Sequence, residues 1–273
     1  MAVEVRPLAG ALGAEVFGVD IATKISDSEF SEIYNAFLEN LVLFFRGQRP
    51  LTPAQHTAFA ARFGEVDYEP FAYPIKPPAV AGCPQILVNV KEASDRSINV
   101  GGLWHADVTF RVRPHKTGVI YAKDAPPFGG DTMFASAYKA YEELSPSMKA
   151  YLEGKTATHD GSRGFDKNAD VYPVAVHPIV IRHPESDRKA LFVNREFTSH
   201  INEVPPTESR GVLEFLYDHI ARPHWNMRFR WTPHSIAFWD NRCTQHYAIW
   251  DYWPNVRCGY RMFVKGTERP SAG

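Results

Sequence analysis

Two histidines and one aspartate are the residues of this sequence best suited to bind a metal ion together. His105 and Asp107 lie two residues apart in an apolar segment that predicts a strand over 104–110. Residues two apart on a strand point to the same face, so this imidazole and this carboxylate can aim at one point. Taken alone, the pair also fits a surface hydrogen bond. His246 follows in a later segment, and two histidines with one carboxylate form the facial triad that binds non-haem Fe(II) and leaves positions open.

Two arginines near the end of the sequence could bind acidic molecules beside such a metal. Arg257 and Arg261 differ by four in a predicted strand over 257–265, so both side chains face the same side. The open metal positions could take a chelating 2-oxo acid and then O₂, and the far carboxylate of that acid would need a fixed cation. A guanidinium binds a carboxylate in two places and stays charged at any working pH. Two cations in one pocket predict two anions, one from a cosubstrate and one from a substrate; the alternative is a solvated sheet edge.

The composition is that of an ordinary globular enzyme. The 273 residues carry 30 Lys and Arg against 31 Asp and Glu, and 44% are apolar. This balance excludes a disordered chain, and the absence of a basic block argues against a nucleic-acid partner. No apolar run is long enough to span a membrane, and the first residues lack the pattern of a signal peptide, so we expect a cytoplasmic protein. The three cysteines predict reduced thiols rather than a disulfide framework.

The elements predicted to position these residues are mainly short strands. Many short strands separated by Pro and Gly turns favour a barrel or jelly roll over alternating βαβ units, with helices outside the sheets. We expect one domain over 1–273, in which the Pro-rich connection 67–102 is a lid or binding loop. The predicted strands span 41–45, 86–90, 104–110, 117–122, 131–134, 176–182, 190–194, 227–231, 235–239 and 257–265, and the predicted helices span 27–39, 53–63, 137–153 and 206–221.

The order of the motifs resembles that of the taurine/dichlorophenoxyacetate (TauD/TfdA) dioxygenase family. The motifs are His-x-Asp at 105–107, Gly-Gly-Asp-Thr at 129–132, Trp-Asp-Asn-Arg-x-Thr-Gln-His at 239–246, and Arg261. The likeness covers nearly the whole chain, including Phe-Phe-Arg-Gly-Gln at 44–48. It implies a double-stranded β-helix with a jelly-roll, cupin-like core and flanking helices. It also implies an oxidoreductase that uses Fe(II), 2-oxoglutarate and O₂, and a homo-oligomer, either a dimer or a tetramer.

The resemblance also assigns roles around the metal. His105, Asp107 and His246 would be the iron ligands and catalytic centre, while Thr132 and Arg261 would bind the distal carboxylate of 2-oxoglutarate. An aspartate at position 107, rather than alanine or glycine, argues against the related halogenases, which need that metal position for a halide. The expected reaction is hydroxylation of a small organic acid, with cleavage where the new hydroxyl shares its carbon with a heteroatom.

The residues implied for substrate binding match the family only in part. Arg257 occupies the position that holds the acidic group of taurine, and Val108 and Phe197 match wall residues of that pocket. The chain departs from the pattern at Glu69, which replaces a substrate-binding histidine, and at Gly101, which replaces an amide that receives the substrate amine. These departures make taurine itself a poor candidate. A sulfonate, a sulfate ester, or an aryloxy or amino carboxylate fits the anion anchor that Arg257 keeps.

Three residues of the early loop have alternative interpretations. Glu69 could pair with a basic group of the substrate or face water. Tyr68 and Tyr73 could wall a flat substrate or pack as anchors of the lid. Other outcomes of the same oxidant, namely desaturation, cyclisation or nitrogen-group oxidation, stay open. A metal-binding or ligand-binding β-barrel without turnover is the alternative from another class.

Overall fold

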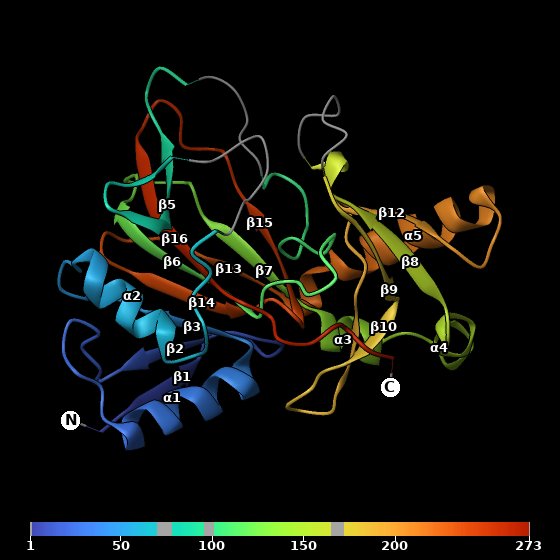
Figure 1. Ribbon diagram of the computed structural model, residues 1–273, viewed down its shortest axis with the longest axis horizontal. Coiled ribbons are helices and arrows are strands. Elements are labelled where there is room, and N and C mark those ends of the chain that lie inside the picture. The colour runs from blue at the N-terminus through green and yellow to red at the C-terminus, as the bar shows by residue number, and fades with distance from the viewer. Residues whose placement is uncertain (1, 70–77, 96–100, 165–171, 273) are drawn as a thin grey trace.

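The computed structural model describes residues 2–69, 78–95, 101–164 and 172–272, and the chain is mainly β (Figure 1). Tyr73 and two stretches of the predicted lid, 70–77 and 96–100, lie outside the described residues. The described part of that connection is not only loop, because the strand predicted over 86–90 extends over Cys83–Lys91. None of the described helices is long and apolar enough to cross a membrane.

Within the described residues, eight strands form a large sheet and three strands form a smaller one. The large sheet has the order β1 (Glu4–Pro7), β2 (Ala14–Phe17), β3 (Val42–Phe45), β14 (Ile236–Asp240), β6 (Thr117–Asp124), β16 (Arg257–Val264), β5 (Cys83–Lys91) and β4 (Ala79–Val80). The smaller sheet has the order β13 (Asn226–Phe229), β7 (Thr132–Ser136) and β15 (Thr244–Ala248). In the middle of the large sheet and throughout the smaller one, neighbouring strands come from distant parts of the chain, as in a jelly roll.

Alternating side chains of the central strands hold the two sheets together. On β3, Phe44 points to the smaller sheet and stacks on Phe229 of β13, with ring centroids 3.9 Å apart. Phe134 of β7 joins this contact at 5.6 Å from Phe44. Phe45 points to the opposite face of the large sheet. The period of two along a strand thus supplies both faces of the sheet with aromatic side chains.

Two helices cover that opposite face, as Figure 1 shows for α1 (Asp27–Asn40) and α2 (Pro53–Ala61). Phe238 of β14 packs on Phe37 of α1, with centroids 4.7 Å apart. A capping box begins α1: the Ser26 hydroxyl accepts a hydrogen bond from the Glu29 amide, and the Glu29 carboxylate accepts one from the Ser26 amide. The helix predicted over 27–39 is therefore confirmed.

The second half of the chain adds a three-stranded sheet and a helix beside it. This sheet has the order β12 (Thr198–Ile201), β8 (Thr156–Asp160) and β9 (Val174–Pro178), and α5 (Pro206–Ile220) packs against β12 (Figure 1). A short hairpin joins β10 (Val180–Arg182) to β11 (Lys189–Leu191). Strands β8, β12 and β15 were not predicted from the sequence.

Two predicted elements are wrong. The helix predicted over 137–153 is two helices, α3 (Ala137–Glu142) and α4 (Pro146–Leu152). Pro146 lacks an amide hydrogen and begins α4 with Ser145 as its cap, so one continuous helix cannot form. The strand predicted over 104–110 is also absent: residues 107–110 form a turn, and Val108 has a positive φ of 47°. The residues of this turn are buried, so the sequence there is apolar and resembles the pattern of a strand.

Buried histidines should make the fold sensitive to acid. Burial lowers the pKa of His56 from 6.5 to about 3, and neither of its ring nitrogens has a described hydrogen-bond partner. The unfolded chain takes up this proton near pH 6.5 and the folded chain does not. The free energy of unfolding should therefore fall as pH drops below 6.5, by up to about 1.4 kcal/mol per pH unit for each such histidine.

The acid sensitivity can be assigned to this residue by urea unfolding at pH 7, 6 and 5. We expect His56→Leu to lose stability less steeply than the wild type as pH falls. The exposed His224 provides the control, since His224→Leu should keep the wild-type slope. An unchanged slope in His56→Leu would show that this histidine does not set the acid limit.

Candidate active site

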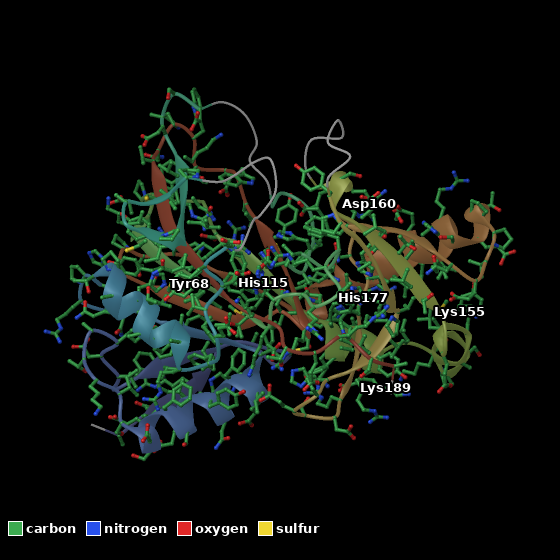
Figure 2. All side chains as sticks on the ribbon, viewed as in Figure 1. Tyr68, His115, Lys155, Asp160, His177 and Lys189 are labelled. Carbon is green, nitrogen blue, oxygen red and sulfur yellow. The ribbon has the colours of Figure 1, made fainter. Side chains whose placement is uncertain are left out.

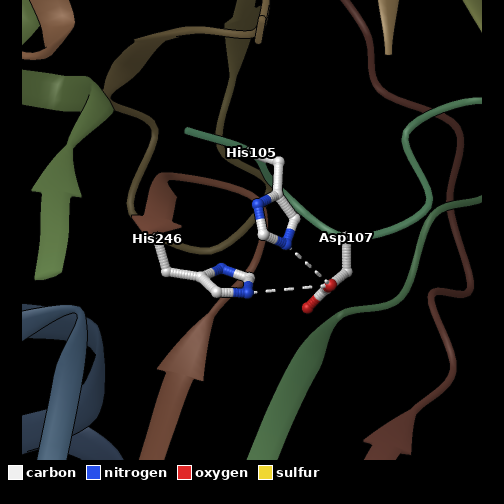
Figure 3. A group of neighbouring side chains, drawn as sticks. All are labelled: His105, Asp107 and His246. Carbon is white, nitrogen blue, oxygen red and sulfur yellow. Dashed lines mark ion pairs between the residues drawn. The ribbon is translucent and has the colours of Figure 1, made fainter. Parts of the chain in front are cut away.

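The structure brings His105, Asp107 and His246 together from distant segments (Figure 3). His246 lies on β15, and an isolated β-bridge joins its backbone to that of His105 through N–H···O contacts of 3.1 and 2.8 Å. The Nε2 atoms of both histidines lie 3.8 Å from Oδ1 of Asp107. All three side chains are buried, and their ligand atoms lie within 4.8 Å of one another.

Asp107 reaches this point from a turn rather than from a strand. Asn241, in the connection between β14 and β15, fixes the turn because its side chain pairs with the backbone of Asp107. The Asp107 amide donates to Asn241 Oδ1 at 2.7 Å, and Asn241 Nδ2 donates to the Asp107 carbonyl at 2.9 Å. In the sequence, the place of residue 241 in the 239–246 motif was the one signal for this role.

The donor atoms fit a metal ion in type and orientation. His105 Nδ1 lies 2.7 Å from the Leu103 carbonyl, so Nδ1 carries the hydrogen and Nε2 presents its lone pair toward Asp107. His246 also turns Nε2 toward Asp107. The separations of 3.8 Å between each Nε2 and Asp107 Oδ1 are too long for hydrogen bonds. Such separations are expected for ligand atoms that surround one ion. This set suits Fe(II).

The protonation states fit metal binding as well. Burial alone would raise the pKa of Asp107, but the positive charge of Arg261 above all holds this pKa well below its usual range. Burial lowers the pKa of His246 far below its ordinary value, and the neighbouring His105 acts in the same direction. An ionised carboxylate and a neutral imidazole are the forms that ligate a metal.

A cavity of about 630 Å³ opens beside the triad. Arg257 and Arg261 of β16 both line it, with Gly259 between them, which confirms that the two arginines face one side. Thr132, Val108, Phe197 and Gly101 line the same cavity. Further walls come from Leu87, Val88, Val90, Lys91, Ile120, Phe134, Gly164, Glu196, Trp239, Ala248, Trp250 and Tyr252.

The two arginines differ in their surroundings. Arg261 forms an ion pair with Asp107, and its buried Nε has no hydrogen-bond acceptor among the described residues. Thr132 is buried, and its Oγ1 accepts the indole N–H of Trp231 at 3.0 Å, which leaves the hydroxyl hydrogen free to donate. No described carboxylate lies within ion-pair distance of Arg257, whose pKa is lowered by burial.

Tyr68 and Glu69 do not line the triad cavity. Both line a separate cavity of about 450 Å³ together with His115 and Arg111; Figure 2 labels Tyr68 and His115. The Asp67 carboxylate holds this region by accepting from His115 Nε2 at 2.9 Å and from Arg111 at 3.2 Å. The structure thus separates Tyr68 and Glu69 from the other predicted substrate-binding residues, and Tyr73 lies outside the described residues.

One more group of side chains has donor atoms close enough to share an ion: His183, Asp240 and Cys243. Its carboxylate is already used, because Asp240 accepts from Arg242 at 2.6 Å and from His183 at 3.0 Å. We therefore interpret this group as a buried hydrogen-bond network that braces the connection between β14 and β15.

Comparisons with known proteins find dioxygenases among the relatives of this chain. A sulfate ester dioxygenase of Pseudomonas putida, described as alpha-ketoglutarate-dependent, is 30% identical over 96% of this chain and 89% of its own. An (S)-phenoxypropionate/alpha-ketoglutarate-dioxygenase of Sphingobium herbicidovorans is 32% identical over 92% of this chain and 91% of its own.

The solved structures confirm the jelly-roll core. The crystal structure of a putative alpha-ketoglutarate-dependent taurine dioxygenase from Burkholderia xenovorans matches 99% of this chain and 92% of its own, at 35% identity and a TM-score of 0.87. The family model "Taurine catabolism dioxygenase TauD, TfdA family" matches residues 4–264. The chain therefore belongs to the TauD/TfdA family of dioxygenases, as its motifs predicted.

Proposed function

We propose that this chain is an Fe(II)- and 2-oxoglutarate-dependent dioxygenase that hydroxylates a small organic acid. The observation that carries the proposal is the placement of one facial triad and two inward-facing arginines in a single cavity. A metal-binding barrel without turnover would need the triad but has no use for two separate anion sites.

The roles of the residues follow from their surroundings. His105, Asp107 and His246 would hold Fe(II), which with 2-oxoglutarate and O₂ supplies the oxidant for C–H hydroxylation. Arg261 now pairs with Asp107, and it would be free to bind another carboxylate once Asp107 serves as a metal ligand. Arg261 then binds the distal carboxylate of 2-oxoglutarate through its unpaired Nε and its terminal nitrogens, and the Thr132 hydroxyl donates to the same group.

The substrate is oriented by charge at one end and by apolar walls elsewhere. Arg257 holds the acidic group, because it lines the cavity and no described carboxylate lies within ion-pair distance of it. Val108 and Phe197 pack beside the triad and exclude water from the reacting carbon. The names of the relatives, a sulfate ester dioxygenase and a phenoxypropionate dioxygenase, support a small anionic substrate.

Succinate formation tests the proposal directly. The protein is supplied with Fe(II), 2-oxoglutarate and O₂ and screened with sulfonates, sulfate esters, aryloxyalkanoates and N-substituted amino acids. We expect at least one class to raise succinate release, and the mass of the product to show an added oxygen. A product lacking two hydrogens would indicate desaturation instead. If no class stimulates the consumption of 2-oxoglutarate or O₂, the proposed activity is wrong.

The remaining predictions concern the whole protein. The homo-oligomeric state, the cytoplasmic location, the single domain over 1–273 and the lid function of the segment 67–102 stay predictions. None of them alters the assignment of residues within the cavity.

A further inference from the structure

Two turns from distant parts of the chain form one apolar wall of the triad cavity. Val108 lies in the first turn, residues 107–110. Phe197 lies in the second turn, residues 195–197, directly before β12, and both side chains line the cavity. Phe110, from the first turn, packs edge to face on Phe197 with ring centroids 4.9 Å apart. These side chains form a small cluster separate from the two large hydrophobic cores, so the place of the wall also depends on what joins the two turns.

One side chain makes hydrogen bonds to both turns. Asn194 Oδ1 accepts a hydrogen bond from the Phe197 amide of the second turn at 2.9 Å. Asn194 Nδ2 donates to Thr109 Oγ1 of the first turn, also at 2.9 Å. Asn194 and Thr109 are each only 1% exposed, so the bond between them is shielded from water. This bond therefore holds the turn of Val108 against the turn of Phe197.

Two histidines of the neighbouring sheet extend this connection. His159 Nδ1 lies 2.9 Å from Thr109 Oγ1 and 3.3 Å from Thr198 Oγ1. The Thr198 hydroxyl in turn accepts a hydrogen bond from the Asn194 amide at 2.9 Å. His177 Nε2 lies 2.9 Å from the Thr109 carbonyl. Thr109 thus joins the first turn both to Asn194 and to the sheet that contains β8 and β9.

The first turn is not held by its own backbone preference. Val108 has a φ of 47°, a conformation that β-branched residues rarely adopt. Such a conformation is strained and persists only where surrounding contacts impose it. Asn241 imposes it from the side of Asp107. Asn194 imposes it from the side of Thr109, so loss of this second contact should let the wall relax while Asp107 stays held.

We propose that Asn194 and Thr109 are positioning residues that set the width of the substrate pocket beside the metal. Neither side chain lines the cavity, so both act through Val108 and Phe197. Their hydrogen bond fixes the wall, and a fixed wall excludes substrates that are branched next to the reacting carbon. The inference rests on the proposed function and adds the residues that decide which substrate shapes are accepted.

Thr109→Val tests the bond, because it removes the hydroxyl and keeps the shape of the side chain. The protein is loaded with Fe(II) and 2-oxoglutarate without O₂, and calorimetry compares unbranched alkanesulfonates with isomers branched next to the acid-bearing carbon. We expect the wild type to prefer the unbranched isomer about tenfold, and Thr109→Val to reduce this preference to about twofold or less. Thr109→Ser, which keeps the hydroxyl, should retain the wild-type preference.

The matched control is Ser209→Ala, which removes another buried hydroxyl that accepts a backbone amide, that of Ile201 at 2.8 Å. It removes a hydrogen bond from β12 without changing the wall, so it should keep the wild-type preference. Iron content and the affinity for 2-oxoglutarate should stay unchanged in every variant. If Thr109→Val does not fold, Thr109→Ala removes the same hydroxyl and is read in the same way.

A wild type without a shape preference overturns the inference, as does Thr109→Val with an unchanged preference. Loss of the preference in Ser209→Ala overturns it too, because lowered stability alone would then explain the effect. Loss of iron from Thr109→Val would show that the bond supports the metal ligand Asp107 instead of the wall. Succinate formation without a shape preference would leave the proposed function intact, and a shape preference without succinate formation would leave this inference intact, so the two failures are distinguishable.

Discussion

His246→Ala and Asp107→Ala are each expected to abolish 2-oxoglutarate-dependent succinate formation. The three ligand atoms lie within 4.8 Å of one another, and no fourth His, Cys, Asp or Glu of the described residues joins this group. Losing an outer partner of a metal ligand costs roughly 10–100-fold in affinity or activity, and losing a ligand should cost more. Iron content after dialysis and succinate release would be measured on the same samples.

The control for this prediction is His200→Ala, which removes an exposed histidine remote from the triad. It should keep its iron and its activity. Unchanged turnover in either triad variant would show that the facial triad does not bind the catalytic metal. If iron is lost but the fold persists, as judged by the unfolding transition, the triad residues act as ligands and not as structural supports.

Arg261→Ala is expected to raise the concentration of 2-oxoglutarate needed for half-maximal activity by about 100-fold or more, since truncating one partner of a buried charge pair costs about 3–5 kcal/mol. The same variant should bind substrate almost normally. Arg257→Ala is the matched comparison, four residues along the same strand and in the same cavity wall. It should weaken substrate and spare 2-oxoglutarate.

The two variants are measured by titrating 2-oxoglutarate and substrate separately. Equal losses for both ligands in both variants would show that the two arginines are assigned wrongly. Arg261→Lys gives a finer test, because a lysine keeps the charge but cannot bind a carboxylate in two places. It should recover only part of the affinity for 2-oxoglutarate.

The sequence predicted those elements whose local pattern matches their tertiary role. The strand over 41–45 was predicted from its apolar run, which is apolar throughout because Phe44 and Phe45 pack into two different hydrophobic clusters. The helix after Ser26 was predictable because Ser26 and Glu29, the two residues of its cap, lie at its start. The long β16 was predicted with its two arginines on one side. In each case the information lies within a few residues of the element.

The parts that were missed depend on contacts between distant segments. The turn at Asp107 forms because Asn241, more than a hundred residues away, binds its backbone. Tyr68 and Glu69 belong to another cavity because Asp67 anchors that segment to His115. Spacing along a sequence carries no signal for either arrangement, and the family resemblance gave the ligands but not what fixes them.

The backbone bridge between the two ligand histidines has a consequence for how the enzyme would mature. The backbone hydrogen bonds between His105 and His246 set the distance between the two histidines, and Asn241 fixes the backbone of Asp107. The ligand side chains are therefore already in place, and a bound ion would have to order few residues. The proposed iron would then bind after folding, unlike the ion of small zinc modules, which fold only around it. A metal site that is formed by the fold itself could also lose and rebind its ion while the protein stays folded.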